Sequence, residues 1–172
     1  MPEEKKQRFE LHKVYVKDMS FESPMAPNVF RTENATPVID VQLNVSHDPL
    51  GDGVYESLLI VTVNGKLNEK DAFLAEVHQA GIYEISGVEP GHTLTSLLEV
   101  ACPNMLFPFA REAINELVVR GGFPQLLLSP VNFDLLYREG LSTGSGDARD
   151  GGNGTADGGE PAAEVDADSA GT

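Results

Sequence analysis

The chain contains a single cysteine, Cys102, among its 172 residues. No disulfide can therefore form within the chain, and a reducing compartment such as the cytosol fits best. The four histidines, His12, His47, His78 and His92, do not have the spacing of metal ligands, and no second cysteine completes a zinc motif. We therefore expect neither a metal nor a cofactor.

Long apolar runs are also absent. Residues 1–6 lack the apolar core of a signal peptide, and no stretch approaches the roughly 20 apolar residues that a membrane-spanning helix needs. Positive charge is scarce, because 12 lysines and arginines face 27 aspartates and glutamates, for a formal net charge of −15. Phosphate groups would be repelled, so we do not expect binding to nucleic acid. Because a signal peptide and a membrane span are both missing, we expect a cytoplasmic protein that does not insert into membranes.

Aromatic residues are missing from residues 140–172, which hold seven acidic residues and one arginine. Such a segment cannot bury enough apolar surface to offset the entropy lost on ordering. We predict a disordered acidic tail there, which most simply keeps the protein soluble. Residues 1–7 are predicted to be a flexible N-terminus, which leaves residues 8–139 as one domain.

Apolar and polar residues alternate through the first half of this domain. Ile39, Val41, Leu43 and Val45 are spaced as in a strand with one solvent-exposed face. We predict antiparallel strands at residues 9–16, 39–45, 54–67 and 72–80, and helices at residues 94–101, 109–120 and 133–139. The fold class is therefore α+β, a four-stranded antiparallel sheet followed by helices that pack on one face.

The helix at 109–120 has the clearest signals. Pro108 sets its first turn, and Gly121-Gly122 offers the left-handed residue at which a helix can end. One apolar face is formed by Ala110, Ile114, Leu117 and Val118.

Several long motifs surround this helix. In order, they are Cys102-Pro103-Asn104, Phe107-Pro108-Phe109-Ala110-Arg111-Glu112, Arg120-Gly121-Gly122-Phe123-Pro124-Gln125-Leu126 and Pro130-Val131-Asn132-Phe133-Asp134. With residues 16–24 and 72–77, they resemble the SecB family of bacterial protein-export chaperones at that family's spacing. The resemblance covers about residues 8–139. Two departures are Ala75, where many relatives have Cys, and the absence near Asn34 of a Trp that relatives often have.

The resemblance implies an ATP-independent chaperone that holds secretory preproteins unfolded in the cytosol. It implies delivery of these clients to the translocation ATPase SecA, whose docking segment is basic and holds zinc. It also implies a homotetramer, a dimer of dimers, with no enzymatic activity. The family's SecA-binding positions match Asp18, Glu22, Leu74 and Glu76, and its subunit-interface positions match Ala75, Val77 and Gln79.

The strand at 72–80 can serve both roles, because successive side chains of a strand point to opposite faces. Leu74, Glu76 and His78 are predicted on one face, and Phe73, Ala75, Val77 and Gln79 on the other. Unfolded clients need extended apolar surface elsewhere. The candidates are Pro27, Val29, Phe30, Phe107, Phe109, Leu126, Leu128, Phe133 and Tyr137, although aromatic residues beside helices are more often core than groove.

Two alternatives remain open at this point. A chaperone of the same fold could be dedicated to one antitoxin. A thiol-dependent enzyme could use Cys102 with His78, His92, Asp134 or Glu99, although nothing in the sequence places these residues together and a buried cysteine is the simpler interpretation.

Overall fold

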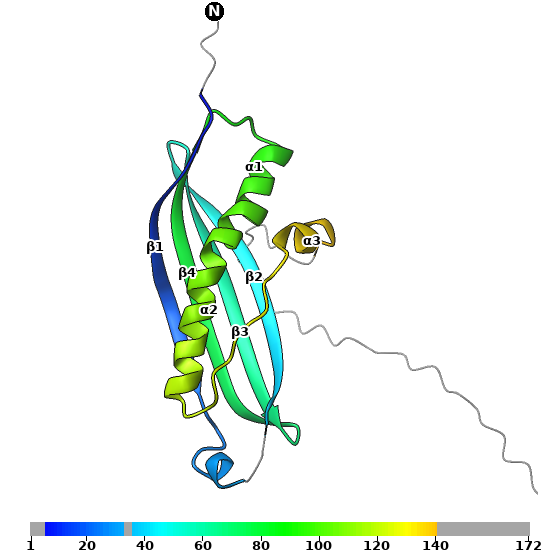
Figure 1. Cartoon of the computed structure of the whole chain (residues 1–172). Coiled ribbons are helices and arrows are strands. Elements are labelled where there is room, and N and C mark those ends of the chain that lie inside the picture. Colours follow the sequence, from blue (N-terminus) through cyan, green and yellow to red (C-terminus); the bar gives the residue numbers. More distant parts are fainter. Residues whose placement is uncertain (1–5, 33–35, 141–172) are drawn as a thin grey trace, which may run out of the picture.

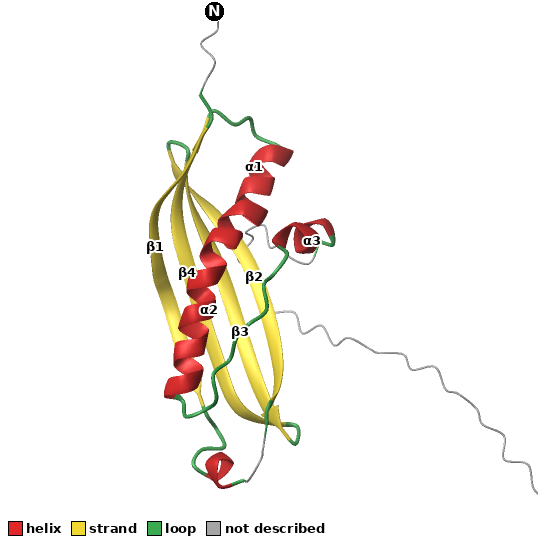
Figure 2. Ribbon diagram, in the orientation of Figure 1, coloured by secondary structure: helices red, strands yellow, loops and turns green. Residues whose placement is uncertain are grey.

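The computed structural model describes residues 6–32 and 36–140. One antiparallel sheet has the strand order β1-β4-β3-β2, and a long helical segment lies across one of its faces (Figures 1 and 2). The strands are β1 (Arg8–Glu22), β2 (Val38–Gly51), β3 (Val54–Leu67) and β4 (Lys70–Ser86), and the helices are η1 (Asn28–Arg31), α1 (His92–Ser96), η2 (Leu97–Ala101), α2 (Cys102–Arg120) and α3 (Phe133–Arg138). The predicted fold class is confirmed.

The predicted strands fall in the right places, and β3 has the predicted bounds. The other three are longer than predicted. β1 and β4 stay paired from Arg8 and Ser86 to Glu22 and Leu74 across two bulges, and β2 pairs with β3 from Val38 to Gly51. The predicted tail lies outside the described residues except for Gly140, and the predicted N-terminal segment except for Lys6 and Gln7.

A two-residue turn joins β3 to β4. Asn68 and Glu69 have φ values of 50° and 64°, the left-handed region that tight hairpins require because it matches the twist of their strands. Leu67 therefore pairs with Lys70, and this pairing determines which face each later side chain of β4 points to.

The core lies between this sheet and α2. Alternate residues of β4, from Phe73 to Ile85, are buried on the face that α2 covers, which confirms the predicted parity of the strand. From α2 the buried residues include Leu106, Ala110, Ile114 and Val118. Gly65 lies opposite Phe73, where a Cβ atom would lie only 2.3 Å from the Phe73 ring. The glycine thus leaves room for that ring over β3.

The long helix differs from the prediction. It was expected to begin at Phe109, after a separate helix at 94–101, but helical backbone runs without a break from His92 to Arg120, through the π turn η2. Pro108 lies inside α2. An internal proline costs about 3 kcal/mol, which the burial of a whole apolar helix face outweighs, since each fully buried large apolar side chain contributes about 1.5–3 kcal/mol.

The chain leaves α2 at Gly122, whose φ is +87°, and runs back as an extended connector, residues 123–132, to α3 (Figure 1). The side chain of Asn115 on α2 accepts a hydrogen bond from the backbone N–H of Leu126 at 3.0 Å. Asn132 caps α3 by accepting from the N–H of Leu135 at 3.0 Å. The connector is therefore tied to α2 near its beginning, and its last residue caps α3.

Candidate functional site: an apolar groove and an acidic sheet face

An apolar groove opens between the connector, the end of α2 and the beginnings of β2 and β4. Its volume is about 170 Å³, and an apolar cavity of about 150 Å³ already holds a benzene ring. The groove is lined by Thr36, Pro37, Ile39, Phe73, Val118, Phe123, Pro124, Gln125 and Leu126. It therefore has room for one apolar side chain of an extended peptide.

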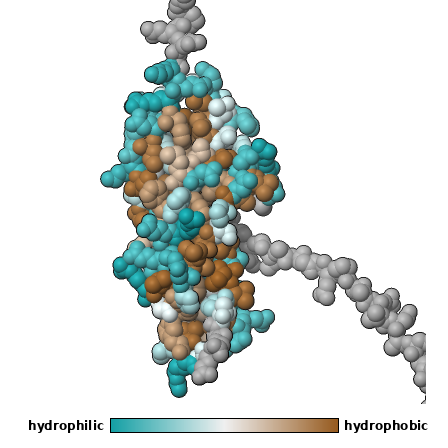
Figure 3. Space-filling model, viewed as in Figure 1, coloured by the Kyte–Doolittle hydropathy of each residue, from teal (hydrophilic) through white to brown (hydrophobic). Residues whose placement is uncertain are grey.

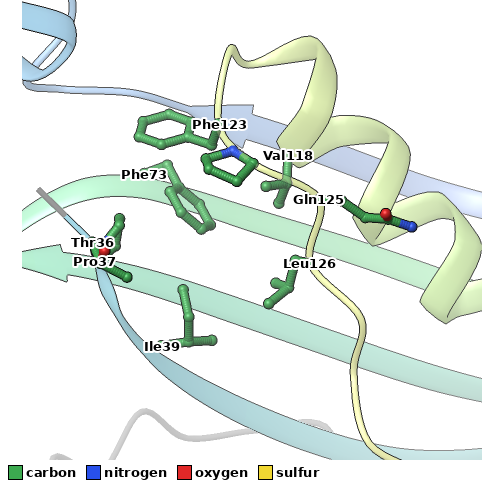
Figure 4. A pocket seen from close by; sticks show the side chains of 9 residues that line it. Thr36, Pro37, Ile39, Phe73, Val118, Phe123, Gln125 and Leu126 are labelled. Atoms are coloured by element: carbon green, nitrogen blue, oxygen red, sulfur yellow. The ribbon is translucent and has the colours of Figure 1, made fainter. Parts of the chain in front are cut away.

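Figure 4 shows that the side chains of Ile39, Phe73 and Leu126 converge on one space, whereas Gln125 points away from it. These three residues come from β2, β4 and the connector. Figure 3 shows that apolar side chains gather along this helix-covered side of the molecule, interrupted by polar ones. The groove is thus part of a wider apolar surface.

A cluster of aromatic rings supports the groove. The ring centroid of Phe123 lies 4.7 Å from that of Phe73 and 5.3 Å from that of Phe30, and Phe21 lies 6.0 Å from Phe73. Phe73 and Phe123 are 1% and 8% exposed, whereas Phe30 on η1 is 51% exposed. A rigid aromatic floor with one accessible ring at its edge suits apolar contact with changing partners.

The opposite, uncovered face of the sheet is acidic along β1 and β4. The antiparallel register places Asp18 opposite His78, Ser20 opposite Glu76 and Glu22 opposite Leu74. Asp18, Glu22, Leu74 and Glu76 therefore lie together on this acidic sheet face, because directly paired residues point to the same side. Asp18 and Glu22 form no ion pair with the described residues.

Glu76 is held in its charged form. Its carboxylate bonds to His78 Nε2 at 2.7 Å and accepts from Thr62 Oγ1 at 2.9 Å. The hydrogen bond with His78, followed by that from Thr62, lowers the pKa of Glu76. This carboxylate is therefore ionised at neutral pH and available to a cationic partner.

A second network stabilises the same face. Tyr15 Oη donates to Glu56 Oε1 at 2.5 Å, and Lys17 Nζ contacts both oxygens of Glu56 at 2.9 and 3.0 Å. The bond from Tyr15 lowers the pKa of Glu56, while burial raises the pKa of Tyr15 to about 12. Lys17 is the extra residue of a bulge between Val16 and Asp18, which aims both Lys17 and Asp18 at this face.

Comparison with known proteins identifies the family. Residues 2–143 match the family described as preprotein translocase subunit SecB. This chain belongs to the SecB family. The protein-export protein SecB of Halorhodospira halophila is 50% identical over 134 residues, 78% of this chain and 76% of that protein. The protein of the same name from Chromobacterium violaceum is 52% identical over 131 residues, 76% of this chain and 86% of that one. The chain is therefore a protein-export chaperone.

A solved structure has the same fold. The SecB-like chaperone of Mycobacterium tuberculosis, in complex with a peptide from an antitoxin, superposes with a TM-score of 0.61 and covers 72% of this chain and 91% of its own. Its sequence identity is only 17%, so the likeness concerns the fold. Export-chaperone relatives near 50% identity favour the export function over the antitoxin alternative.

The structure separates the candidate client-binding residues of this SecB-family chain. Leu126 lines the groove, and Phe30 lies at its edge, against Phe123. Val29 is the buried residue of η1, whereas Pro27, just before η1, is exposed. Three candidates are buried core residues and not surface, namely Phe107, Leu128 and Phe133. The rings of Phe107 and Phe133 pack edge to face, 6.0 Å apart. Tyr137 is half-buried beside His92. Phe109, 47% exposed, lies in a different hollow between α2 and β1.

The candidate interface residues Ala75, Val77 and Gln79 are buried within the single chain, on the face that α2 covers. Gln79 Nε2 donates to the backbone oxygen of Tyr15 at 2.9 Å. These side chains therefore support α2 and β1 from inside, and they can influence association of SecB-family subunits only through those elements. Their role in the interface stays a prediction.

The thiol-enzyme alternative is weakened by the position of Cys102. Its side chain is fully buried, and burial raises its pKa to about 12, so the nucleophilic thiolate is scarce at neutral pH. His78 lies on the opposite face of the sheet, and Glu99 bonds to His47 instead. Among the described residues, no group of three or more potential metal ligands occurs, and no helix is long and apolar enough to cross a membrane.

Sequence reasoning missed several groove residues. The strand pattern predicts only that Phe73 shares a face with Ala75 and Val77, and Phe123 appears only within a motif. A usable signal was the glycine at position 65, which lies across the β3–β4 hairpin from Phe73 and indicates a large ring lying over β3. The contribution of Val118 and Ile39 depends on the path of the connector, for which the sequence has no comparable signal.

Proposed function

We propose that this chaperone holds unfolded preproteins in the apolar groove and docks to SecA through the acidic sheet face. The observation that supports this division most directly is the geometry of β4. Phe73 lines the groove on one side of the sheet, and Leu74, the next residue, lies among the carboxylates on the other. One strand thus contributes to two surfaces that point in opposite directions.

Client binding follows from the chemistry of the groove. Its lining is almost entirely apolar, so the free energy of binding comes from burial of apolar client surface, about 25 cal/mol per Å². Such burial does not require a particular sequence. Leu127, 71% exposed on the connector, extends the apolar surface beyond the groove, so that an extended chain can make several weak contacts in succession.

SecA docking follows from the charge of the opposite face. Asp18, Glu22 and Glu76 offer carboxylates to a basic segment, and Leu74 adds an apolar contact among them. Electrostatic attraction of this kind accelerates encounter and weakens with salt. The groove and the acidic face do not overlap, so a loaded chaperone can dock without first releasing its client.

We also infer assembly into a cytoplasmic homotetramer, as the resemblance implies. β1 is an edge strand, and exposed apolar residues lie along it and along the outer side of α2. These are Phe9, Val16 and Met19 on β1, and Met105, Phe109 and Val119 on α2. An unpaired edge beside apolar surface favours association with a second copy.

Two substitutions separate the surfaces. Leu126→Ser should weaken capture of a denatured preprotein about fivefold, because part of a leucine burial is lost, and leave SecA binding unchanged. Glu76→Lys should weaken SecA binding, make the remainder less sensitive to salt, and leave client capture unchanged. Glu89→Lys, an equal charge change in the exposed loop before α1, is the matched control.

Calorimetric titration of each variant with SecA and with a denatured client provides the measurement. Equal loss of both activities in one variant would mean that one surface serves both partners. Loss of SecA binding in Glu89→Lys as large as in Glu76→Lys would mean that overall charge, and not the acidic sheet face, attracts SecA.

A further inference from the structure

A buried carboxylate lies in the only π turn of the described helices. η2 (Leu97–Ala101) lies within the continuous helix that runs from His92 to Arg120, and it carries Glu99, which is 2% exposed. π turns are rare and are frequent at functional sites. Glu99 Oε1 lies 3.0 Å from His47 Nε2 on β2, so this side chain joins the long helix to an edge strand of the sheet.

The environment of Glu99 makes this contact important. Its second oxygen, Oε2, is buried without a hydrogen bond to any described residue. A buried carboxylate without a partner is strongly unfavourable. Ser57, directly opposite His47 on β3, is also buried, and its hydroxyl has no partner among the described residues. His47 is therefore the group on which the burial of Glu99 depends.

Few other charges act on this pair. Asp48 follows His47 on β2 and adds a second attraction for a protonated imidazole. β3 presents the uncharged Ser57. From α3, which packs against η2, Asp134 and Arg138 bond to each other at 2.8 Å with largely exposed side chains. The charge state of His47 is thus the main variable of the site.

We propose that His47 and Glu99 form a pH-sensitive latch, which fastens β2 to the start of the long helix in the acidic range and loosens as the pH rises above neutrality. The first part of β2 contributes Ile39 to the groove. The latch holds the other end of the same strand. Loosening it therefore weakens the contact between β2 and the long helix, while the pairing of β2 with β3 is kept and the acidic sheet face is not disturbed.

The direction follows from linkage. The hydrogen bond with Glu99 raises the pKa of His47 above its ordinary value of 6.5, against an opposing effect of burial. A histidine whose pKa is raised by folding stabilises the folded state fully below about pH 6.5. This contribution is lost as the pH rises through the raised pKa. Deprotonation leaves the buried Glu99 carboxylate without its cationic partner.

Amide hydrogen exchange of the full chain between pH 6 and 8.5, corrected for the intrinsic pH dependence of exchange, tests the latch. Opening at η2 and at the end of β2 should increase about tenfold over this range, the equivalent of one hydrogen bond to a charged group. His47→Gln and Glu99→Gln should abolish the pH dependence. His92→Gln, which removes an exposed histidine on α1, should behave as the unaltered chain.

A flat profile in the unaltered chain, or an unaltered pH dependence in His47→Gln, overturns the proposal. Should the variants fold poorly, proton NMR titration of His47 in the unaltered chain decides instead. A midpoint above 6.5 that falls to the ordinary value in urea supports the latch. A midpoint at or below 6.5 in the folded chain overturns it.

Discussion

Replacing Val77 by aspartate tests whether this residue acts within the chain or between chains. Val77 is fully buried on the sheet face beneath α2. Loss of its two methyl groups removes about 1.6 kcal/mol of apolar burial, and an unpaired carboxyl group adds a further 2–3 kcal/mol or so. The sum, about 4 kcal/mol, is a large fraction of the 5–15 kcal/mol that stabilises a typical domain.

Urea unfolding followed by circular dichroism, together with light scattering at micromolar concentration, provides the measurement. We expect loss of secondary structure and loss of assembly to occur together, at much lower urea concentration than in the unaltered chain. Val77→Ala should cost about 2 kcal/mol and keep the assembly. Asn44→Asp, at an exposed position on the opposite face of the sheet, should change stability little. A reduced mass with a fully stable fold would refute this reasoning and place Val77 directly between subunits.

Two further predictions concern the thiol and the C-terminal segment. Cys102 should not react with a thiol reagent at pH 8 until the chain is unfolded, since burial raises its pKa to about 12. Cys102→Ser should retain chaperone activity at a cost in stability of about 1–3 kcal/mol. Loss of activity in a stable variant would revive the enzyme alternative. Deletion of residues 140–172 should leave the melting temperature nearly unchanged while reducing solubility, and a sharp fall in melting temperature would show that this segment packs on the domain.

The sheet could be predicted largely from the sequence because its pattern is local. The alternation of apolar and polar residues in β2 and β4 indicates which face of the sheet is buried. Phe73, Ala75 and Val77 are buried as this pattern predicts. The same parity places Leu74 and Glu76 on the other face. The pairing of β1 with β4 then brings Asp18 and Glu22 beside Leu74 and Glu76. The preference for short connections between neighbouring strands limits the number of possible strand orders.

The helix and the groove were harder to predict because they depend on tertiary packing. Pro108 favours a helix start locally, yet the helix continues through it because Leu106 and Phe107, just before it, are buried. The pairing of His47 with Glu99 joins residues far apart in the chain, and neither position has a local signal. The groove requires the path of the connector, which depends on the hydrogen bond from Leu126 to Asn115 and on the packing of Phe123 against Phe73.

The left-handed turn at Asn68 and Glu69 affects how the chain tolerates change in length. Because the side chains of β4 alternate, a shift of one residue in its pairing with β3 would exchange the faces of Phe73 and Leu74 and of every residue after them. The groove would then receive carboxylates, and the acidic sheet face would receive apolar residues. Point substitutions along β4 alter one surface at a time, whereas a single inserted or deleted residue between Leu67 and Phe73 would damage both.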